Sequence, residues 1–194
     1  AGRRDWGWGM SRFAVERIGD AELYLGDCRE ILPDLTYVHA LVTDPPYGIG
    51  ETNARNLSRD RLALATDYGH FEWDQQPIDE ALLRAVMQAA RWNVIFGGNY
   101  YPLPPTRCWL VWDKLNSGDF ADCELAWTNL PKAVRRIQYL WNGMIKAPGE
   151  TRGDHPTQKP VGVMSWCLQQ LPDGTKSVID PFMGSGTTGV ACAK

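Results

Sequence analysis

The chain has 194 residues, a length that suits one α/β domain or two very small ones. Hydrophobic residues make up 44% and charged residues 22%, so the composition is that of a globular protein that can bury a core. Five scattered cysteines without a C-x-x-C pair, and three histidines far apart, argue against a disulfide scaffold and a zinc site. No apolar run approaches the ~20 residues of a membrane span. We therefore expect no metal, no membrane and a cytoplasmic protein.

Charge is unevenly distributed along the chain. The net charge is −3, but residues 1–127 carry −7 whereas residues 128–159 carry +4. A basic stretch in an acidic chain is compatible with one side that faces a polyanion. It is equally compatible with an ordinary solvated surface.

Alternating apolar and helical patterns indicate an α/β domain over residues 10–194, and residues 1–9 look like an expression remnant or a loose arm. Strands are predicted at 13–17, 22–25, 39–43, 93–96, 108–112, 123–127, 136–141 and 176–179, and helices at 27–35, 78–92, 160–171 and from 187 onward. A turn at Gly19-Asp20 makes the first two strands a hairpin. Residues 48–77 are polar and irregular. This alternation predicts a largely parallel sheet.

Two predicted strands end in residues that can do chemistry. The strand before Asp180 runs into Pro181-Phe182-Met183-Gly184-Ser185-Gly186-Thr187-Thr188, a glycine turn that opens a helix and lets a ligand approach the backbone. A glycine turn needed only for packing is an equally open interpretation. The strand 39–43 ends at Asp44-Pro45-Pro46-Tyr47, where two prolines stiffen the exit and fix a carboxylate beside an aromatic ring.

Together these segments resemble the catalytic and cofactor motifs of the amino-group DNA methyltransferases. His155-Pro156-Thr157-Gln158-Lys159-Pro160 is similar to a further box of that family, and Gly26-Asp27-Cys28 lies where the family has an acidic residue near the cofactor adenine. The catalytic motif precedes the glycine turn, which is the permuted order of the beta class. The resemblance covers roughly residues 23–194.

The resemblance implies a Rossmann-like, S-adenosylmethionine-dependent methyltransferase fold: a mostly parallel, doubly wound sheet with an antiparallel hairpin and a circularly permuted motif order. Ligands of such sheets bind at the carboxyl ends of strands beside the switch point. The strands that end at Asp44 and Asp180 should therefore lie side by side.

The resemblance also implies a division of roles among residues. Asp44 and the Pro45 carbonyl would polarise the target amine, with Pro46 fixing the turn and Tyr47 stacking on a base flipped out of the duplex. Asp44 would also border S-adenosylmethionine. The other residues expected to bind this cofactor are Asp27, Cys28, Thr157, Lys159, Asp180, Pro181, Phe182, Gly184, Ser185, Gly186, Thr187 and Thr188.

Target recognition is expected in a small insert at residues 115–151, which contains the basic stretch and two exposed-looking aromatic residues, Tyr139 and Trp141. The DNA-binding candidates are Arg135, Arg136, Lys146 and Trp73, with Arg55, Arg59 and Arg61 as a second group.

The resemblance predicts that the family continues beyond Lys194 with a strand that carries an acidic ribose ligand. We therefore expect a truncated chain that folds poorly or binds the cofactor weakly, and an extension of ~30–40 residues, about one strand and one helix, to restore both.

The resulting hypothesis is a site-specific DNA methyltransferase that acts on the N6 amine of adenine in double-stranded DNA, in a prokaryote or a phage. It would be a monomer or homodimer, with a cognate restriction endonuclease as a possible partner. Cytosine-N4 methylation is the alternative enzyme activity, although such enzymes more often carry Ser in place of Asp44. A cofactor-binding remnant without catalysis is the alternative from another class.

Overall fold

The protein is built around one mixed sheet of six strands, in the order β10-β3-β4-β6-β5-β7. The computed structural model describes residues 13–48, 76–115, 121–142, 145–150 and 158–194. The six strands are β3 (Val38–Thr43), β4 (Ala90–Phe96), β5 (Trp109–Asp113), β6 (Cys123–Thr128), β7 (Arg135–Gln138) and β10 (Val178–Ile179).

Strand direction divides this sheet into two halves. β10, β3 and β4 run parallel, whereas β6 runs antiparallel to both β4 and β5, and β7 is parallel to β5. The largely parallel α/β architecture expected from the sequence is confirmed, and the antiparallel pairings lie on the side away from β10. The arrangement is Rossmann-like, with the parallel half bringing together the ends of β10, β3 and β4.

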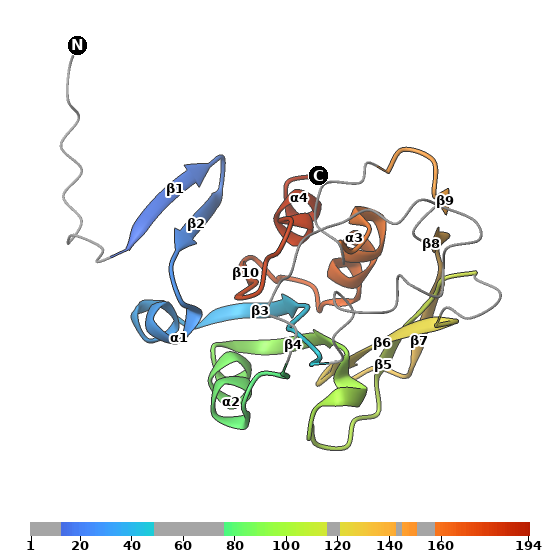
Figure 1. Cartoon of the computed structure of the whole chain (residues 1–194), viewed down its shortest axis with the longest axis horizontal. Helices are drawn as coiled ribbons and strands as arrows, with labels where there is room; N and C mark the ends of the chain where they lie inside the picture. The colour runs from blue at the N-terminus through green and yellow to red at the C-terminus, as the bar shows by residue number, and fades with distance from the viewer. Residues whose placement is uncertain (1–12, 49–75, 116–120, 143–144, 151–157) are drawn as a thin grey trace, which may run out of the picture.

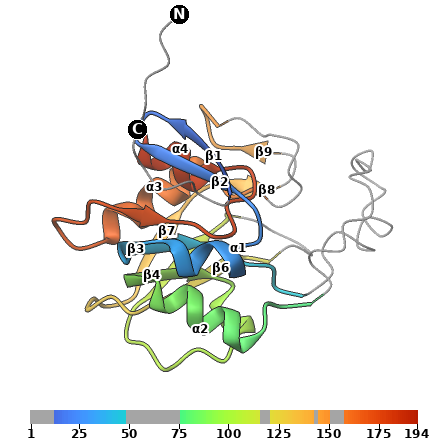
Figure 2. The same cartoon turned by 90° about the vertical axis from the view of Figure 1, so that its left-hand side faces the viewer.

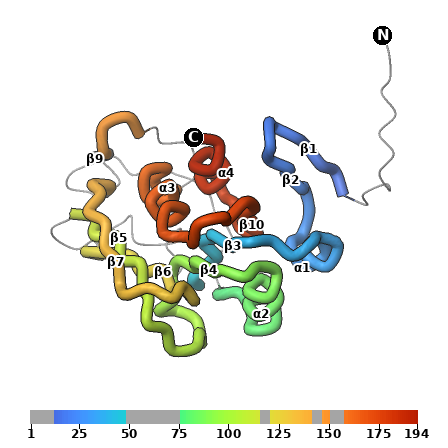
Figure 3. Tube along the Cα trace, turned by 180° about the vertical axis from the view of Figure 1, so that it is seen from behind, coloured from blue at the N-terminus to red at the C-terminus, as the bar shows by residue number. Residues whose placement is uncertain are grey.

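Helices cover both faces of the parallel half, as Figures 1 and 2 show. The helices are α1 (Cys28–Ile31), α2 (Glu80–Gln88), α3 (Val161–Gln170) and α4 (Thr187–Cys192), with 3-10 turns η1 (Leu32–Asp34) and η4 (Gly98–Tyr100). Seen from behind, α1 and α2 lie on one side of β3 and β4, and α3 and α4 lie on the other (Figure 3).

The alternation of side chains along β3 explains these two layers. Ala40 and Val42 are fully buried in a core that includes α3 residues such as Val163, while Leu41 is buried in a second core with α2 residues such as Leu82. Successive strand residues point to opposite faces, so a continuous apolar strand requires a cover on each face. The run before Asp44 is therefore a central strand.

Two small antiparallel pairs accompany the main sheet. β1 (Ala14–Ile18) and β2 (Ala21–Leu25) form the expected hairpin, with Ile18 opposite Ala21 across the Gly19-Asp20 turn. Figure 1 places this hairpin beside the sheet. The second pair is β8 (Trp141–Asn142) with β9 (Ile145–Lys146).

The predicted helix 78–92 was too long, because α2 ends at Gln88 and β4 already begins at Ala90. Ala90 fits the helical spacing, but Ala90 and Trp92 both pair with β3, and Val38 donates its N–H to the carbonyl of Ala89. Pairing with a buried neighbouring strand overrides the local helical pattern. The predicted strand 136–141 is likewise divided, since β7 ends at Gln138 and Trp141 begins β8.

We expect Gly98→Ala to destabilise the fold, because an added Cβ would lie 2.5 Å from Cβ of Trp127 and 3.0 Å from its backbone nitrogen. Overpacking of this kind typically costs about 1–3 kcal/mol. Thermal unfolding of Gly189→Ala is the matched control, since nothing lies within 4 Å of its added Cβ in α4. Equal melting temperatures for the two variants would contradict the close packing of η4 on β6.

Candidate active site

The ends of β3 and β10 meet at one edge of the sheet, as the sequence predicted. The two strands are parallel neighbours, with Ala40 opposite Val178 and Leu41 opposite Ile179. Asp44 and Asp180 therefore follow their strands at the same edge. The Thr43 hydroxyl donates to Oδ1 of Asp180 at 2.6 Å, which ties the two strand ends together by their side chains.

Asp180 is fully engaged in holding this edge together. Besides the bond from Thr43, its carboxylate accepts one from the Thr188 hydroxyl at 2.6 Å and one from the Phe182 N–H at 3.1 Å. Burial raises the pKa of Asp180, while these donors oppose the rise. The residue thus joins β3, the glycine turn and the first turn of α4, and Thr188 is buried as part of that joint.

Asp44 has both carboxylate oxygens occupied. Nζ of Lys159 lies 2.5 Å from Oδ2, and the Tyr47 hydroxyl donates to Oδ1. Burial raises the pKa of Asp44, and the ammonium of Lys159 and the hydroxyl of Tyr47 act against that rise. The carboxylate is therefore a partly buried acceptor, with the side chain 21% exposed, and its charge is balanced by a lysine from a distant part of the chain.

Lys159 itself lies between two carboxylates. The residue is only 7% exposed, and its Nζ is 3.2 Å from Oε2 of Glu124 on β6. The other oxygen of Glu124 lies 2.5 Å from Nζ of Lys114. Burial alone would lower the pKa of Lys159, but Asp44 and Glu124 outweigh burial and raise it. Burial would raise the pKa of Glu124, but the two lysines outweigh burial and lower it.

Tyr47 is held by residues that follow β4. Its ring stacks on Tyr100 at 5.1 Å between centroids and 19° between planes. Gly97 has φ +65°, and a Cβ there would collide with the Tyr47 ring, so glycine is required by conformation and by space. Tyr101 donates its hydroxyl to the Pro46 carbonyl at 2.5 Å. The Asp44–Tyr47 turn is therefore fixed from the side of β4.

The glycine turn after Asp180 is open to solvent. Gly184 and Gly186 have φ values of +50° and +76°, and a Cβ on Gly186 would meet only the Met183 side chain, at 3.5 Å. Met183, Gly184 and Ser185 are exposed. This turn can receive a ligand against its backbone beside the ends of β10 and β3.

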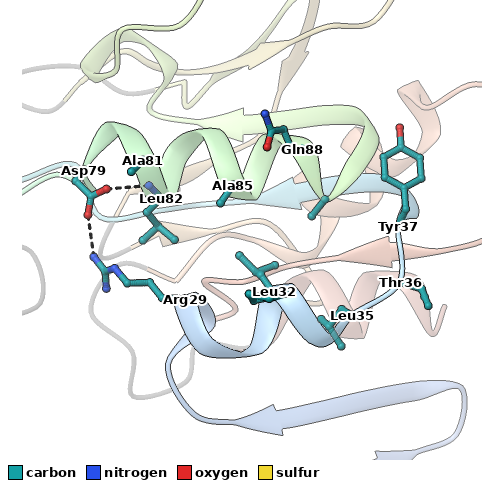
Figure 4. A pocket seen from close by; sticks show the side chains of 12 residues that line it. Arg29, Leu32, Leu35, Thr36, Tyr37, Asp79, Ala81, Leu82, Ala85 and Gln88 are labelled. Atoms are coloured by element: carbon teal, nitrogen blue, oxygen red, sulfur yellow. Dashed lines mark hydrogen bonds and ion pairs between the residues drawn. The ribbon is translucent and has the colours of Figure 1, made fainter.

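Asp27 and Cys28 open helix α1 near the same edge. The Asp27 carboxylate accepts from the Arg29 N–H at 2.8 Å and so caps the helix, and the half-buried Cys28 packs on the α2 core. Arg29 pairs with Asp79 at 3.2 Å, which joins the starts of α1 and α2 (Figure 4). The groove between these helices is lined mainly by apolar side chains and contains neither Asp44 nor Lys159.

Several predicted residues take other roles or lie outside the description. Thr157, Trp73 and the arginines 55, 59 and 61 lie outside the described residues, as does the side chain of Lys146. Arg135 and Arg136 are exposed on β7, the edge strand, and Arg136 lies 3.8 Å from Asp113.

The expectation that Tyr139 and Trp141 are exposed was wrong. Trp141 is 8% exposed and packs in the α3 core. Tyr139 donates its hydroxyl to Glu150 at 2.7 Å; burial and this carboxylate raise the pKa of Tyr139 to about 12. Glu150 also accepts from the first N–H groups of α3, at Val161 and Gly162, so these aromatic residues support the helix that follows Lys159.

Sequence reasoning missed Glu124 and Lys114. The register of β5 and β6 places Glu124 opposite Trp112, so Lys114, two residues further along, falls on the same face. An acidic residue within an otherwise apolar strand, CELAWT, was the available signal. Without the order of strands in the sheet, that signal did not identify Lys159 as its partner.

Comparisons with known proteins bear on the family and the fold of the chain. A family model described as DNA methylase matches residues 125–194. The crystal structure of an M1.HpyAVI–SAM complex is similar in fold, with a TM-score of 0.51 and 24% identity over 87% of this chain and 86% of that chain.

Curated relatives match over shorter segments. The type II methyltransferase M2.MboI of Moraxella bovis is 48% identical over 42 residues, which is 22% of this chain and 15% of that protein. M2.LlaDCHI of Lactococcus lactis subsp. cremoris is 33% identical over 61 residues, 31% of this chain and 23% of that protein. The matched segments thus span less than a quarter of these relatives.

Within the described residues, no helix is long and apolar enough to cross a membrane.

We expect Lys159→Met to destabilise the protein by about 3–5 kcal/mol at neutral pH, because it leaves Asp44 and Glu124 buried without their shared cation. Without the lysine the pKa of Asp44 rises further above that of an unfolded aspartate, ~3.9, whereas Glu124 keeps its ion pair with Lys114. When the pKa of a carboxyl group is higher in the folded protein than in the unfolded chain, the group lowers stability at pH values above its folded-state pKa. At pH values below its unfolded-state pKa it has no effect on stability. The loss should therefore shrink as pH falls from 7 towards 4.5.

Urea unfolding at several pH values measures this effect, with Lys176→Met, an exposed lysine, as the control. A loss in Lys159→Met that is small, or that does not change with pH, would show that the two carboxylates do not depend on Lys159.

Proposed function

We propose that the protein containing this chain methylates the N6 amine of adenine in double-stranded DNA. The match of residues 125–194 to a family model described as DNA methylase supports this proposal. The observation that carries the proposal is the buried carboxylate of Asp44 at the end of β3, directly beside the glycine turn that follows β10. Cytosine-N4 methylation remains the second candidate, since the same acceptor could serve that amine.

The proposed cofactor is S-adenosylmethionine, which is bound in the structure of M1.HpyAVI. The turn at Gly184–Gly186 has the backbone freedom to accept the methionine part. The Asp27 side chain caps α1 and lies 3.6 Å from Arg29, but it is 49% exposed, so its carboxylate is proposed to contact the adenine of the cofactor. When bound, this cofactor supplies an electrophilic methyl group. The inner face of the turn is held by Asp180, so we assign that residue to the architecture of the site and not to direct ligand contact.

An exocyclic amine is a weak nucleophile because its lone pair is delocalised into the ring. Acceptors placed at its two protons favour a tetrahedral nitrogen with an available lone pair, so catalysis is a matter of position and polarisation. Asp44 would be one acceptor and the Pro45 carbonyl the other. Each oxygen of the Asp44 carboxylate already accepts one bond, from Tyr47 or from Lys159, so the amine would bind at a remaining lone pair or take the place of one of these donors.

Tyr47 would present a ring to the extruded base, and it already stacks on Tyr100. Base flipping suits a pocket in which the amine must reach a carboxylate at the end of a buried strand. The hydroxyl of Tyr47 contacts Asp44 directly. Tyr47 would therefore contribute through its hydroxyl as well as through stacking, which extends the role expected from the sequence.

We expect Asp44→Asn to reduce methyl transfer by at least about 100-fold, because the variant keeps the shape of the side chain but replaces an acceptor by a donor on one side. Mass spectrometry of nucleosides from treated DNA separates methyladenine, methylcytosine and no product. Tyr47→Phe should also lose activity, because it removes the hydroxyl that donates to Asp44. Near-normal turnover in Asp44→Asn would show that Asp44 has no part in the mechanism.

The exposed arginines of β7 are proposed to contact DNA phosphates. If so, each of Arg135→Gln and Arg136→Gln should reduce the slope of log affinity against log salt by about one. Arg84→Gln on α2 is the matched control, since Arg84 is exposed and lies 3.1 Å from Glu80 one turn earlier in the same helix. Unchanged slopes in the β7 variants would show that these arginines do not contact phosphates and form an ordinary solvated surface.

A further inference from the structure

The feature that the proposed reaction does not use is the second half of the buried charge cluster. It consists of Glu124 on β6 and Lys114 just beyond β5, next to the pair of Asp44 and Lys159. The side chains of Glu124 and Lys114 are 21% and 17% exposed. Withdrawing four charged groups largely from water carries a desolvation cost that ion pairs often do not fully offset. Stability alone therefore gives little reason for this arrangement.

The geometry gives Lys159 two carboxylates at different distances. Its Nζ is 2.5 Å from Asp44 and 3.2 Å from Glu124, so a small movement of the ammonium exchanges its nearer partner. Glu124 is itself held from the other side by Lys114, whose Nζ also lies 5.0 Å from the centre of the Trp112 ring. Glu124 is thus a fixed anchor, and Lys159 is the group that can move.

We infer that Glu124 is a positioning residue for the proposed methyl transfer: it holds Lys159 beside Asp44 and takes up the ammonium when Asp44 turns to an incoming amine. The inference rests on the proposed function for its purpose, but the coupling of the three side chains is a property of the protein alone. Without Glu124, the lysine would have Asp44 as its sole carboxylate in the cluster, and the ammonium would have no second partner to move to when an amine bonds to Asp44.

The charged groups around Asp44 set the direction of the test. Tyr47 belongs to its own turn, Lys159 precedes α3, Glu124 comes from β6, and Asp180 follows β10. Removing the negative charge of Glu124 ends its electrostatic repulsion of the Asp44 carboxylate. It also leaves Asp44 as the carboxylate with which Lys159 pairs. Both effects favour the ionised form, so the pKa of Asp44 should fall.

The experiment is a carboxyl carbon NMR titration of Asp44 in the full protein without cofactor or DNA, with the signal assigned by its loss in Asp44→Asn. Glu124→Gln should lower the pKa of Asp44 by about half a pH unit or more. Glu124→Asp keeps the negative charge, so the pKa of Asp44 in this variant should lie close to that in the parent protein. Asp122→Asn is the matched control, because it removes an exposed carboxylate two residues away.

Lys114→Gln gives a second test with the opposite sign and covers the case in which Glu124→Gln does not fold. Losing the cation that anchors Glu124 should draw Lys159 towards Glu124 and raise the pKa of Asp44. An unchanged pKa of Asp44 in the folded Glu124 and Lys114 variants would overturn the inference.

Kinetics test the purpose of the arrangement. Glu124→Gln should reduce kcat about 10- to 100-fold, with an acid limb of the pH profile moved to lower pH, while Asp122→Asn should match the parent protein. A fall in kcat with no movement of the acid limb would indicate a merely structural role and overturn the proposal. If the parent protein transfers no methyl group to DNA, the proposed function fails, and the titration still decides the coupling of Glu124 to Asp44.

Discussion

The ammonium of Lys159, buried between Asp44 and Glu124, is the interaction on which the site depends. It joins three segments that are distant in the sequence: the end of β3, the middle strand β6 and the residue that precedes α3. Asp44 and Lys159 are tolerable inside the protein only with their partners, because an unpaired buried charge costs several kcal/mol, and Glu124 is balanced by Lys114 as well. The segments must therefore be assembled together, and the site forms as a consequence of the same packing that completes the fold.

A second set of contacts complements this charge cluster on the other side of β3. Asp180 takes hydrogen bonds from Thr43, Thr188 and the Phe182 N–H, so the open glycine turn is supported from within by a single carboxylate. Two carboxylates at adjacent strand ends thus have different tasks. One is satisfied by neutral donors and holds the architecture, while the other is balanced by a lysine and remains available for exchange.

Much of this arrangement was predictable from the sequence. Continuous apolar runs before Asp44 and Asp180 indicate buried parallel strands, which end at one edge of the sheet. That these two strands are neighbours was expected from the fold that the motif resemblance implies. The position of Glu124 did not follow, because its contact with Lys159 requires β6 to lie between β4 and β5 in reverse direction. The end of α2 and the burial of Trp141 were missed for a similar reason: pairing and packing with distant segments decided them.

The shortness of β10 has a dynamic consequence. Only Val178 and Ile179 form its ladder with β3, and in the described part of the sheet β10 is an edge strand. The strand is held at both ends by side chains instead, through Ser177 to His39 and through Asp180 to Thr43. Local opening that breaks few contacts has a low free energy. Amide hydrogens of β10 should therefore exchange with solvent through small openings that leave β3 and β4 paired, so the glycine turn can move as a unit while the carboxylate of Asp44 stays in place.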